Sequence, residues 1–343
     1  MALRRGSGMD WLSHLLDVTP VSGQVDVRCH FGAPWRIDQA QAGAGEIPYH
    51  VLLSGTAILD QGDAAPLRLQ AGDVLLFPQG AGHTLHDGSG ARSRTIRSHA
   101  AGPLVIKQTV GKASAGPRTA AGTPAGADDL DLLCGRFLVH PRQGRLLRDY
   151  LPAQLVIRPL AVVDQIAPAD GLSAAAVAER RLRELLLLMR NEANGVGLGG
   201  RALLNALSAA LFALVLRHAS LAEAAPAGLL ALAGEPRLAP ALDAMFQEAS
   251  HPWTLEDLAE RCNMSRATFV RHFQARTGRP AIALLTDIRM ALALDHLKRT
   301  TMSTGAVAEA VGYQSEAAFQ RAFKQHVGQT PAAWRAATRS GTP

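Results

Sequence analysis

The spacing of apolar residues divides the chain into a strand-rich first part and a helical second part. From residue 25 to about residue 160, short apolar runs such as HVLLSGTAIL and LRLQAGDVLLFP are broken by Gly, Pro and Asp. This pattern is typical of strands joined by turns. Farther along, Leu and Ala recur at three and four residues, which predicts helices over residues 173–190 and 200–223. Residues 241–339 are predicted to be helical throughout.

Two segments lack this periodicity. Residues 111–129 are rich in Gly, Ala and Pro, and they are expected to form a long mobile loop. The stretch AEAAPAGLLALAGEPRLAP contains Pro226, Pro236 and Pro240, so it is expected to be a linker with a short helical piece.

A repeated segment lies in the helical part. SRATFVRHFQARTG (residues 265–278) aligns with SEAAFQRAFKQHVG (residues 315–328) at a separation of 50 residues. Each copy follows a short alanine-containing helix and a break, and each ends at glycine with proline just beyond. This arrangement is that of a helix-turn-helix used twice.

The helical period gives each copy a packing face and a reading face. Phe269 and Phe273 lie on one side of the helix, and the polar residues lie on a separate arc. Arginine can pair with guanine and glutamine with adenine in the major groove, and a serine N-cap leaves free amides for a phosphate. The residues expected to contact double-stranded DNA are Ser265, Arg266, Ala267, Val270, Arg271 and Gln274, and then Ser315, Glu316, Ala317, Gln320, Arg321 and Lys324.

The alternative is that the phenylalanines form only a helical core and the arginines only a solvated face. Two copies at a fixed spacing favour DNA binding over this alternative. The amphipathic helix expected over residues 281–300 is about 30 Å long, which would hold the two reading helices near one DNA turn apart, about 34 Å. Charge agrees, because residues 237–343 hold 13 Lys or Arg and 9 Asp or Glu and so carry most of the net charge of +6.

LAERCNMSRATFVRHFQARTG, the linker helix with Arg289 and Ala293, and VAEAVGYQSEAAFQRAFKQHVGQTPAAWR resemble the AraC/XylS family of bacterial transcription regulators. The resemblance covers residues 237–339. It implies a two-headed DNA-binding domain joined to a separate sensing or dimerising domain, with RNA polymerase as an expected partner. Ala267, Val270 and Ala317 depart from the polar readers expected at such positions, which leaves the base preference open.

GDVLLFPQGAGH (residues 72–83) matches the second cupin motif, and the match predicts a small β-barrel with His83 pointing inward. His50, His83 and His86 could form a partial transition-metal site, because imidazole suits such ions. The alternative, histidines hydrogen-bonded to backbone at the barrel mouth, is favoured because catalytic metal sites usually hold three protein ligands. We therefore expect no cofactor, and a cupin metalloenzyme fused to a DNA-binding domain is the weaker interpretation.

The N-terminal half also resembles the cupin-containing branch of the family that responds to hypochlorous acid. The resemblance rests on MDWLSHLL, Cys29 before HFGAPW, YHVLLSGTAIL, FPQGAGHTL, and LLCGRF with Cys134. It implies that Cys29 and Cys134 sense oxidants, which requires an accessible thiolate and a resolving thiol within reach. Inert core cysteines remain the alternative. Cys262 aligns with Val311 and is expected to be a small buried residue.

Composition and targeting signals change the picture little. With 48% apolar and 19% charged residues the chain is an ordinary folded protein, and three scattered cysteines do not make a disulfide framework. The start shows no export signal, and the uncharged stretch over residues 202–216 is too short to span a bilayer. We expect a cytoplasmic protein with no membrane partner.

Together these patterns predict an α+β protein with three parts: a cupin-like β-barrel sensor domain (1–168), a helical connector (169–236) and an all-α domain with two helix-turn-helix motifs (237–343). The expected function is a DNA-binding transcriptional regulator, not an enzyme, controlled by oxidation of Cys29 and Cys134 or, alternatively, by a small ligand or metal in the barrel. The helices at 173–190 and 200–223 are expected to form a homodimer, unless their leucines only cover the barrel.

Overall fold

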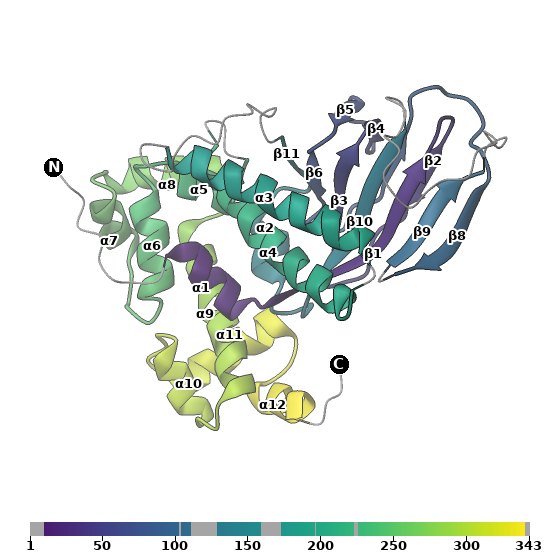
Figure 1. The fold of residues 1–343 in the computed structure, drawn as a ribbon. Coiled ribbons are helices and arrows are strands. Elements are labelled where there is room, and N and C mark those ends of the chain that lie inside the picture. The colour runs from purple at the N-terminus through teal and green to yellow at the C-terminus, as the bar shows by residue number, and fades with distance from the viewer. Residues whose placement is uncertain are drawn as a thin grey trace. The chain divides into compact units, whose positions relative to one another are not determined.

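The computed structural model describes residues 10–102, 104–110, 129–158, 173–195, 197–222 and 226–339. The described residues form two compact units that do not follow the order of the sequence (Figure 1). The sheet unit comprises Val21–Leu138 and Pro152–Leu221. The helical unit comprises the described parts of Met1–Pro20, Val139–Leu151 and Ala222–Pro343. Nearly all of the loop expected over residues 111–129 lies outside the described residues.

Two sheets make up the β-structure of the sheet unit. The larger has the strand order β11-β6-β3-β10-β1-β9-β8 and the smaller the order β2-β7-β4-β5. The strands are β1 (Val21–Phe31), β2 (Arg36–Gln39), β3 (Glu46–Ser54), β4 (Thr56–Asp60), β5 (Leu67–Gln70), β6 (Val74–Leu76), β7 (His83–His86), β8 (Ile96–Ala101), β9 (Leu104–Thr109), β10 (Leu130–Val139) and β11 (Leu155–Ile157). Apolar side chains of both sheets, including Phe31, Leu52, Leu59 and Leu85, form one core. The expected cupin-like fold is confirmed.

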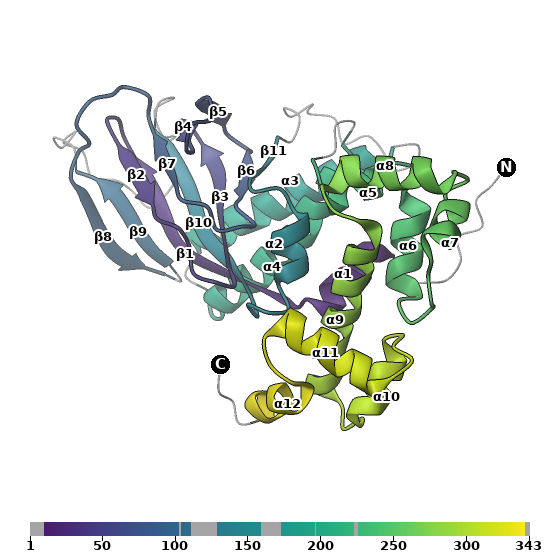
Figure 2. The ribbon, with the colours of Figure 1, turned by 180° about the vertical axis from the view of Figure 1, so that it is seen from behind.

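Helices α3 (Ala174–Asn194) and α4 (Gly200–Ser220) pack against each other, and α4 packs on β1 of the larger sheet (Figures 1 and 2). Both predicted helices are therefore present, and they are part of the sheet unit, which differs from the separate connector expected over residues 169–236. Close packing requires Gly23, because a Cβ there would lie 2.4 Å from the backbone nitrogen of Ala209.

One helix among the described residues, α4, is long and apolar enough to cross a membrane, so the expectation that this stretch is too short to do so is wrong. Its composition has a simpler cause, because its apolar side, including Leu211 and Phe212, is buried inside the sheet unit. Length and composition alone are therefore weak evidence for a membrane span.

The helical unit holds both copies of the sequence repeat. Its elements are α1 (Trp11–Val18), α2 (Arg145–Tyr150), α5 (Leu229–Gly234), α6 (Ala239–Gln247), α7 (Leu255–Arg261), α8 (Arg266–Thr277), α9 (Ala281–Arg299), α10 (Thr304–Ala310), α11 (Glu316–Val327) and α12 (Pro331–Arg339). Helix α7 packs on α8, α10 packs on α11, and α9 joins the two pairs. The predicted tandem helix-turn-helix and its linker helix are thus present.

Helices α1 and α2 come from the N-terminal half of the chain but belong to the helical unit. Helix α1 packs on α6 and α9, and α2 packs on α9. Leu12 and Leu15 of α1 and Leu146 and Leu147 of α2 are buried. The boundary expected at residue 168 therefore differs from the observed division, because two short helices of the first part complete the core of the last part.

Candidate functional site

Each of the two candidate DNA-reading helices begins at a serine and ends at a glycine. The hydroxyl of Ser265 accepts a hydrogen bond from the backbone N–H of Thr268, and the hydroxyl of Ser315 accepts one from Ala318. Gly278 and Gly328 close the helices in the left-handed conformation, with φ of 70° and 83°. The repeated serine and glycine are therefore the caps that define α8 and α11.

The phenylalanines of the repeat form the buried face of each reading helix. The ring centroids of Phe269 and Phe273 are 5.5 Å apart, and those of Phe319 and Phe323 are also 5.5 Å apart. All four rings are buried. Of the proposed DNA contacts, Val270 is half-buried, and the others are exposed: Ser265, Arg266, Ala267, Arg271, Gln274, Ser315, Glu316, Ala317, Gln320, Arg321 and Lys324. A duplex can therefore reach this face, and contact with bases stays a prediction.

Among these exposed polar side chains, Arg266, Gln320 and Glu316 also hold local side-chain partners. The Arg266 guanidinium lies 2.9 Å from a carboxylate oxygen of Glu256, and the Gln320 amide donates to Glu316 at 2.8 Å. Both interactions are at the surface, where such pairs contribute little and can be exchanged for contacts with a phosphate or a base.

A second set of residues lies inside the sheet unit, where strand order brings both proposed sensor cysteines together. Cys29 is on β1 and Cys134 on the adjacent strand β10, close enough that Cys29 affects the pKa of the Cys134 thiol. On the other side of β10, register places His50 of β3 directly opposite Cys134. The His50 Nδ1 atom lies 3.2 Å from the Cys134 sulfur. All three cysteines are free thiols.

A chain of hydrogen bonds continues from Cys134 through two imidazole rings. The Nε2 atoms of His50 and His83 are 2.7 Å apart, and Nδ1 of His83 lies 3.0 Å from the Ala81 carbonyl oxygen. A carbonyl can only accept, so Nδ1 of His83 carries the proton and its Nε2 accepts from His50. Nδ1 of His50 is then left without a proton and accepts from the Cys134 thiol. We call Cys29, Cys134, His50 and His83 the thiol–imidazole cluster.

The environment keeps this cluster uncharged. Burial, with a smaller contribution from His83, lowers the pKa of His50 to about 3. Burial also lowers the pKa of His83, partly offset by its hydrogen bond to Ala81. The contact with Cys29, together with burial, raises the pKa of the Cys134 thiol well above its ordinary value. At neutral pH the cluster is a protonated thiol beside a neutral base.

The structure does not bring the third proposed metal ligand to this cluster. His86 is three residues beyond His83 on β7, so it points to the other face of the strand. Its Nε2 atom lies 3.0 Å from a carboxylate oxygen of Asp60. Among the described residues, no group of three or more His, Cys, Asp or Glu side chains is arranged to hold a metal ion.

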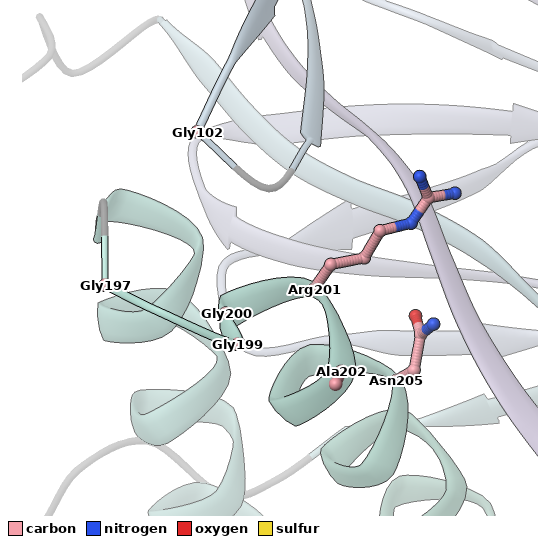
Figure 3. Close-up of a pocket in the computed structure, with 7 residues that line it drawn as sticks. All are labelled: Gly102, Gly197, Gly199, Gly200, Arg201, Ala202 and Asn205. Carbon is pink, nitrogen blue, oxygen red and sulfur yellow. The ribbon is translucent and has the colours of Figure 1, made fainter.

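Two of the cavities lined by described residues lie in the sheet unit. The one that reaches the cluster has a volume of about 470 Å³, and its wall includes His83, Asp38, Asp60 and Thr84. The other, of about 670 Å³, lies at the start of α4, and Figure 3 shows Arg201 and Asn205 extending from the first turns of that helix. The Asn205 side chain accepts a hydrogen bond from the backbone N–H of Val25, so it fastens α4 to β1.

Residues 10–221 match a family model described as cupin, and residues 258–337 match one described as a helix-turn-helix domain. An uncharacterised HTH-type transcriptional regulator of Haemophilus influenzae is 30% identical over 95% of this chain and 98% of its own length. The RCS-specific HTH-type transcriptional activator RclR of Escherichia coli is 26% identical over 98% of this chain and 100% of its own length. The HTH-type transcriptional regulator MtrA of Neisseria gonorrhoeae is 26% identical over 95% of this chain and 98% of its own. With its cupin sheets and tandem reading helices, the chain belongs to the cupin-containing branch of the AraC family of DNA-binding transcriptional regulators.

Proposed function

We propose that this regulator is switched by oxidation of Cys29 and Cys134 to a disulfide. The observation that supports this most strongly is that two free thiols lie on adjacent strands, where Cys29 affects the pKa of Cys134 and the Cys134 thiol donates to a neutral imidazole. Thiols on adjacent strands can be joined when their Cα atoms lie within about 7 Å of each other. The Escherichia coli relative is specific, by its name, for reactive chlorine species, which supports an oxidant of that class.

With hypochlorous acid the chemistry is balanced by groups of the cluster. The Cys134 sulfur attacks chlorine and forms an S–Cl bond, while the Cys134 proton passes by way of His50 to the departing hydroxide, which leaves as water. The Cys29 sulfur then attacks the Cys134 sulfur, and chloride and one proton are released as the S–S bond forms. Two thiols are oxidised, and one molecule of hypochlorous acid is reduced to chloride and water.

The connectivity of the chain supplies a route for the signal. Strand β1, which carries Cys29, follows α1 after two residues, and β10, which carries Cys134, leads to α2 after five residues. Both helices are part of the helical unit that holds the reading helices. A shift of β1 against β10 on bridging would therefore pull on segments that pack against the linker helix α9.

We further propose that the regulator acts in the cytoplasm as a homodimer formed through α3 and α4. Leu187 and Leu188 of α3 and Leu203 of α4 are 58%, 56% and 48% exposed, which is unusual for leucines on a long helix hairpin. Two-fold pairing there would present two helical units to repeated half-sites. The word activator in the Escherichia coli relative's name supports RNA polymerase as a partner.

Serine substitutions test the thiol switch, with Cys262→Ser as the matched control because Cys262 is a buried thiol in the helical unit. After treatment with one equivalent of hypochlorous acid, peptide mapping under non-reducing conditions should find Cys29 linked to Cys134 in the wild type and in Cys262→Ser. Cys29→Ser and Cys134→Ser should lack the link, and their retention of promoter fragments should not respond to oxidant. Normal oxidant-dependent binding by Cys29→Ser would contradict the proposal.

A second candidate signal is a transition metal held by His50 and His83, whose Nε2 atoms face each other and of which His83 lines a cavity. Elemental analysis of the purified protein, compared with that of His83→Gln, decides this. A stoichiometric metal that is lost in the variant would support it, and no bound metal in the wild type would exclude it.

A further inference from the structure

Helix α2 connects three separate parts of the helical unit. It is a six-residue helix from the segment between β10 and β11, yet it packs on the linker helix α9. Its last residue, Tyr150, is 1% exposed, and its hydroxyl donates to the buried carboxylate of Asp287 on α9 at 2.7 Å. This bond joins residues that are 137 positions apart in the sequence.

The same helix reaches the end of the first reading helix. Arg279 stands two residues after α8, and its guanidinium lies 3.2 Å from the Asp149 carboxylate and 5.1 Å from the centroid of the Tyr150 ring. The Arg279 guanidinium is also 3.8 Å from Asp287. An arginine that stacks on an aromatic ring while pairing with two carboxylates is held in one orientation.

The second reading helix is tied to the same point. His326, in the last turn of α11, has its Nδ1 atom 3.4 Å from the Asp287 carboxylate. Arg145, the first residue of α2, donates to the His326 carbonyl oxygen at 3.1 Å. The end of α8, the middle of α9 and the end of α11 thus meet at α2. We call Tyr150, Asp287, Arg279 and His326 the α2 lock.

Close packing at the end of α2 leaves little room for movement. Gly228, just before α5, has φ of 91°, and a Cβ there would lie 2.0 Å from the Tyr150 carbonyl oxygen. The Gly228 N–H donates to the carbonyl of Arg276 on α8, so this contact also joins α2 to the first helix-turn-helix. Burial and the Asp287 charge raise the pKa of Tyr150, which keeps its hydroxyl protonated as a donor.

A protein that reads two turns of DNA with two helices recognises the spacing of its sites through the distance between those helices. We propose that the α2 lock is a positioning device for DNA recognition. It fixes α8 relative to α11 within one protomer, and so determines which spacing the regulator accepts between the DNA segment read by α8 and the segment read by α11. Below, these two segments are called half-sites. The proposal rests on DNA reading by both helices. It does not depend on the cysteine switch, because the test below uses reduced protein.

The variant Tyr150→Phe tests the lock by removing only the hydroxyl. Its matched control is Tyr313→Phe, which removes the hydroxyl of a half-buried tyrosine in the turn before α11 that is outside the lock. The probes are a duplex selected by the reduced wild-type protein from a random-sequence pool, the same duplex with one, two, three or five base pairs inserted between its half-sites, and a duplex with one half-site.

The wild type and Tyr313→Phe should lose affinity at least tenfold when two base pairs are inserted. For Tyr150→Phe, the fold loss of affinity caused by the same insertion should be at least threefold smaller than for the wild type. Its affinity for the single half-site should be unchanged, and its thermal unfolding should remain cooperative. Asp287→Asn, which keeps the shape of the side chain but removes its charge, should show the same relaxed spacing. If Tyr150→Phe and Asp287→Asn both discriminate between spacings as the wild type does, the lock has no positioning role.

Discussion

His50 is a buried neutral base, and its burial has a consequence for stability. Its pKa is about 3 in the folded protein, against an ordinary value of 6.5, because burial disfavours the charged ring. The unfolded chain therefore takes up a proton between pH 6.5 and 3 that the folded chain does not. The contribution of His50 to the free energy of unfolding should be constant above pH 6.5 and should fall as the pH drops from 6.5 towards 3.

We expect His50→Gln to show a smaller fall in the free energy of unfolding between pH 7 and pH 4 than the wild type, measured by urea denaturation. The variant His99→Gln is the control, because His99 is an exposed residue of β8. If His50→Gln and His99→Gln keep the same pH dependence as the wild type, His50 is not held neutral by burial.

At this scale the sequence allowed His83 to be placed inside the barrel, and resemblance singled out Cys29 and Cys134 as candidate sensors, which stays a prediction. The sequence did not allow the distance between Cys29 and Cys134 to be predicted, because β1 and β10 are about a hundred residues apart and their pairing depends on the whole sheet order. The prediction that His86 joins His50 and His83 in a metal site is wrong for a local reason. A period of two residues places His83 and His86 on opposite faces of one short strand.

Helix α8 allows a test in which two arginines of one element are compared. Arg271 is exposed on the reading face, whereas Arg276, near the end of the same helix, pairs with Glu235 at 2.9 Å. Arg271→Ala should weaken binding to the selected duplex by about 1–3 kcal/mol, the usual cost of a lost base contact. Arg276→Ala removes the same charge and should change the affinity much less, as measured by fluorescence anisotropy at one fixed salt concentration. Equal losses would mean that only net charge matters.

The elements most accurately predicted from sequence are those with a strong period and clear caps. Helices α8 and α11 begin after the predicted serines and end at the predicted glycines. Helix α2 was not predicted, because six residues are too few to show a period and its N-cap Gly144 makes no side-chain cap. Its role in the α2 lock depends on contacts with Asp287 and His326, which are far away in the sequence, so no local pattern could predict them.

For the whole molecule, the exposed leucines of α3 predict a concentration-dependent dimer. The double variant Leu187→Gln/Leu188→Gln should raise the dimer dissociation constant at least tenfold, measured by sedimentation velocity, because apolar area buried on pairing would be lost. Val105→Gln changes another exposed apolar residue, on β9, and should stay dimeric. A double variant that sediments as the wild type does would place the dimer interface elsewhere.

The discontinuous helical unit also affects how the protein is made. During synthesis α1 and α2 leave the ribosome before α9 exists, and at about 5–20 residues per second about 7 to 27 seconds separate Tyr150 from Asp287. Until then the leucines of both helices lack the surface that later covers them. Newly made chains should therefore need chaperone protection over this interval. A C-terminal fragment that begins near the sequence repeat would lack α1 and α2, two helices of its own core.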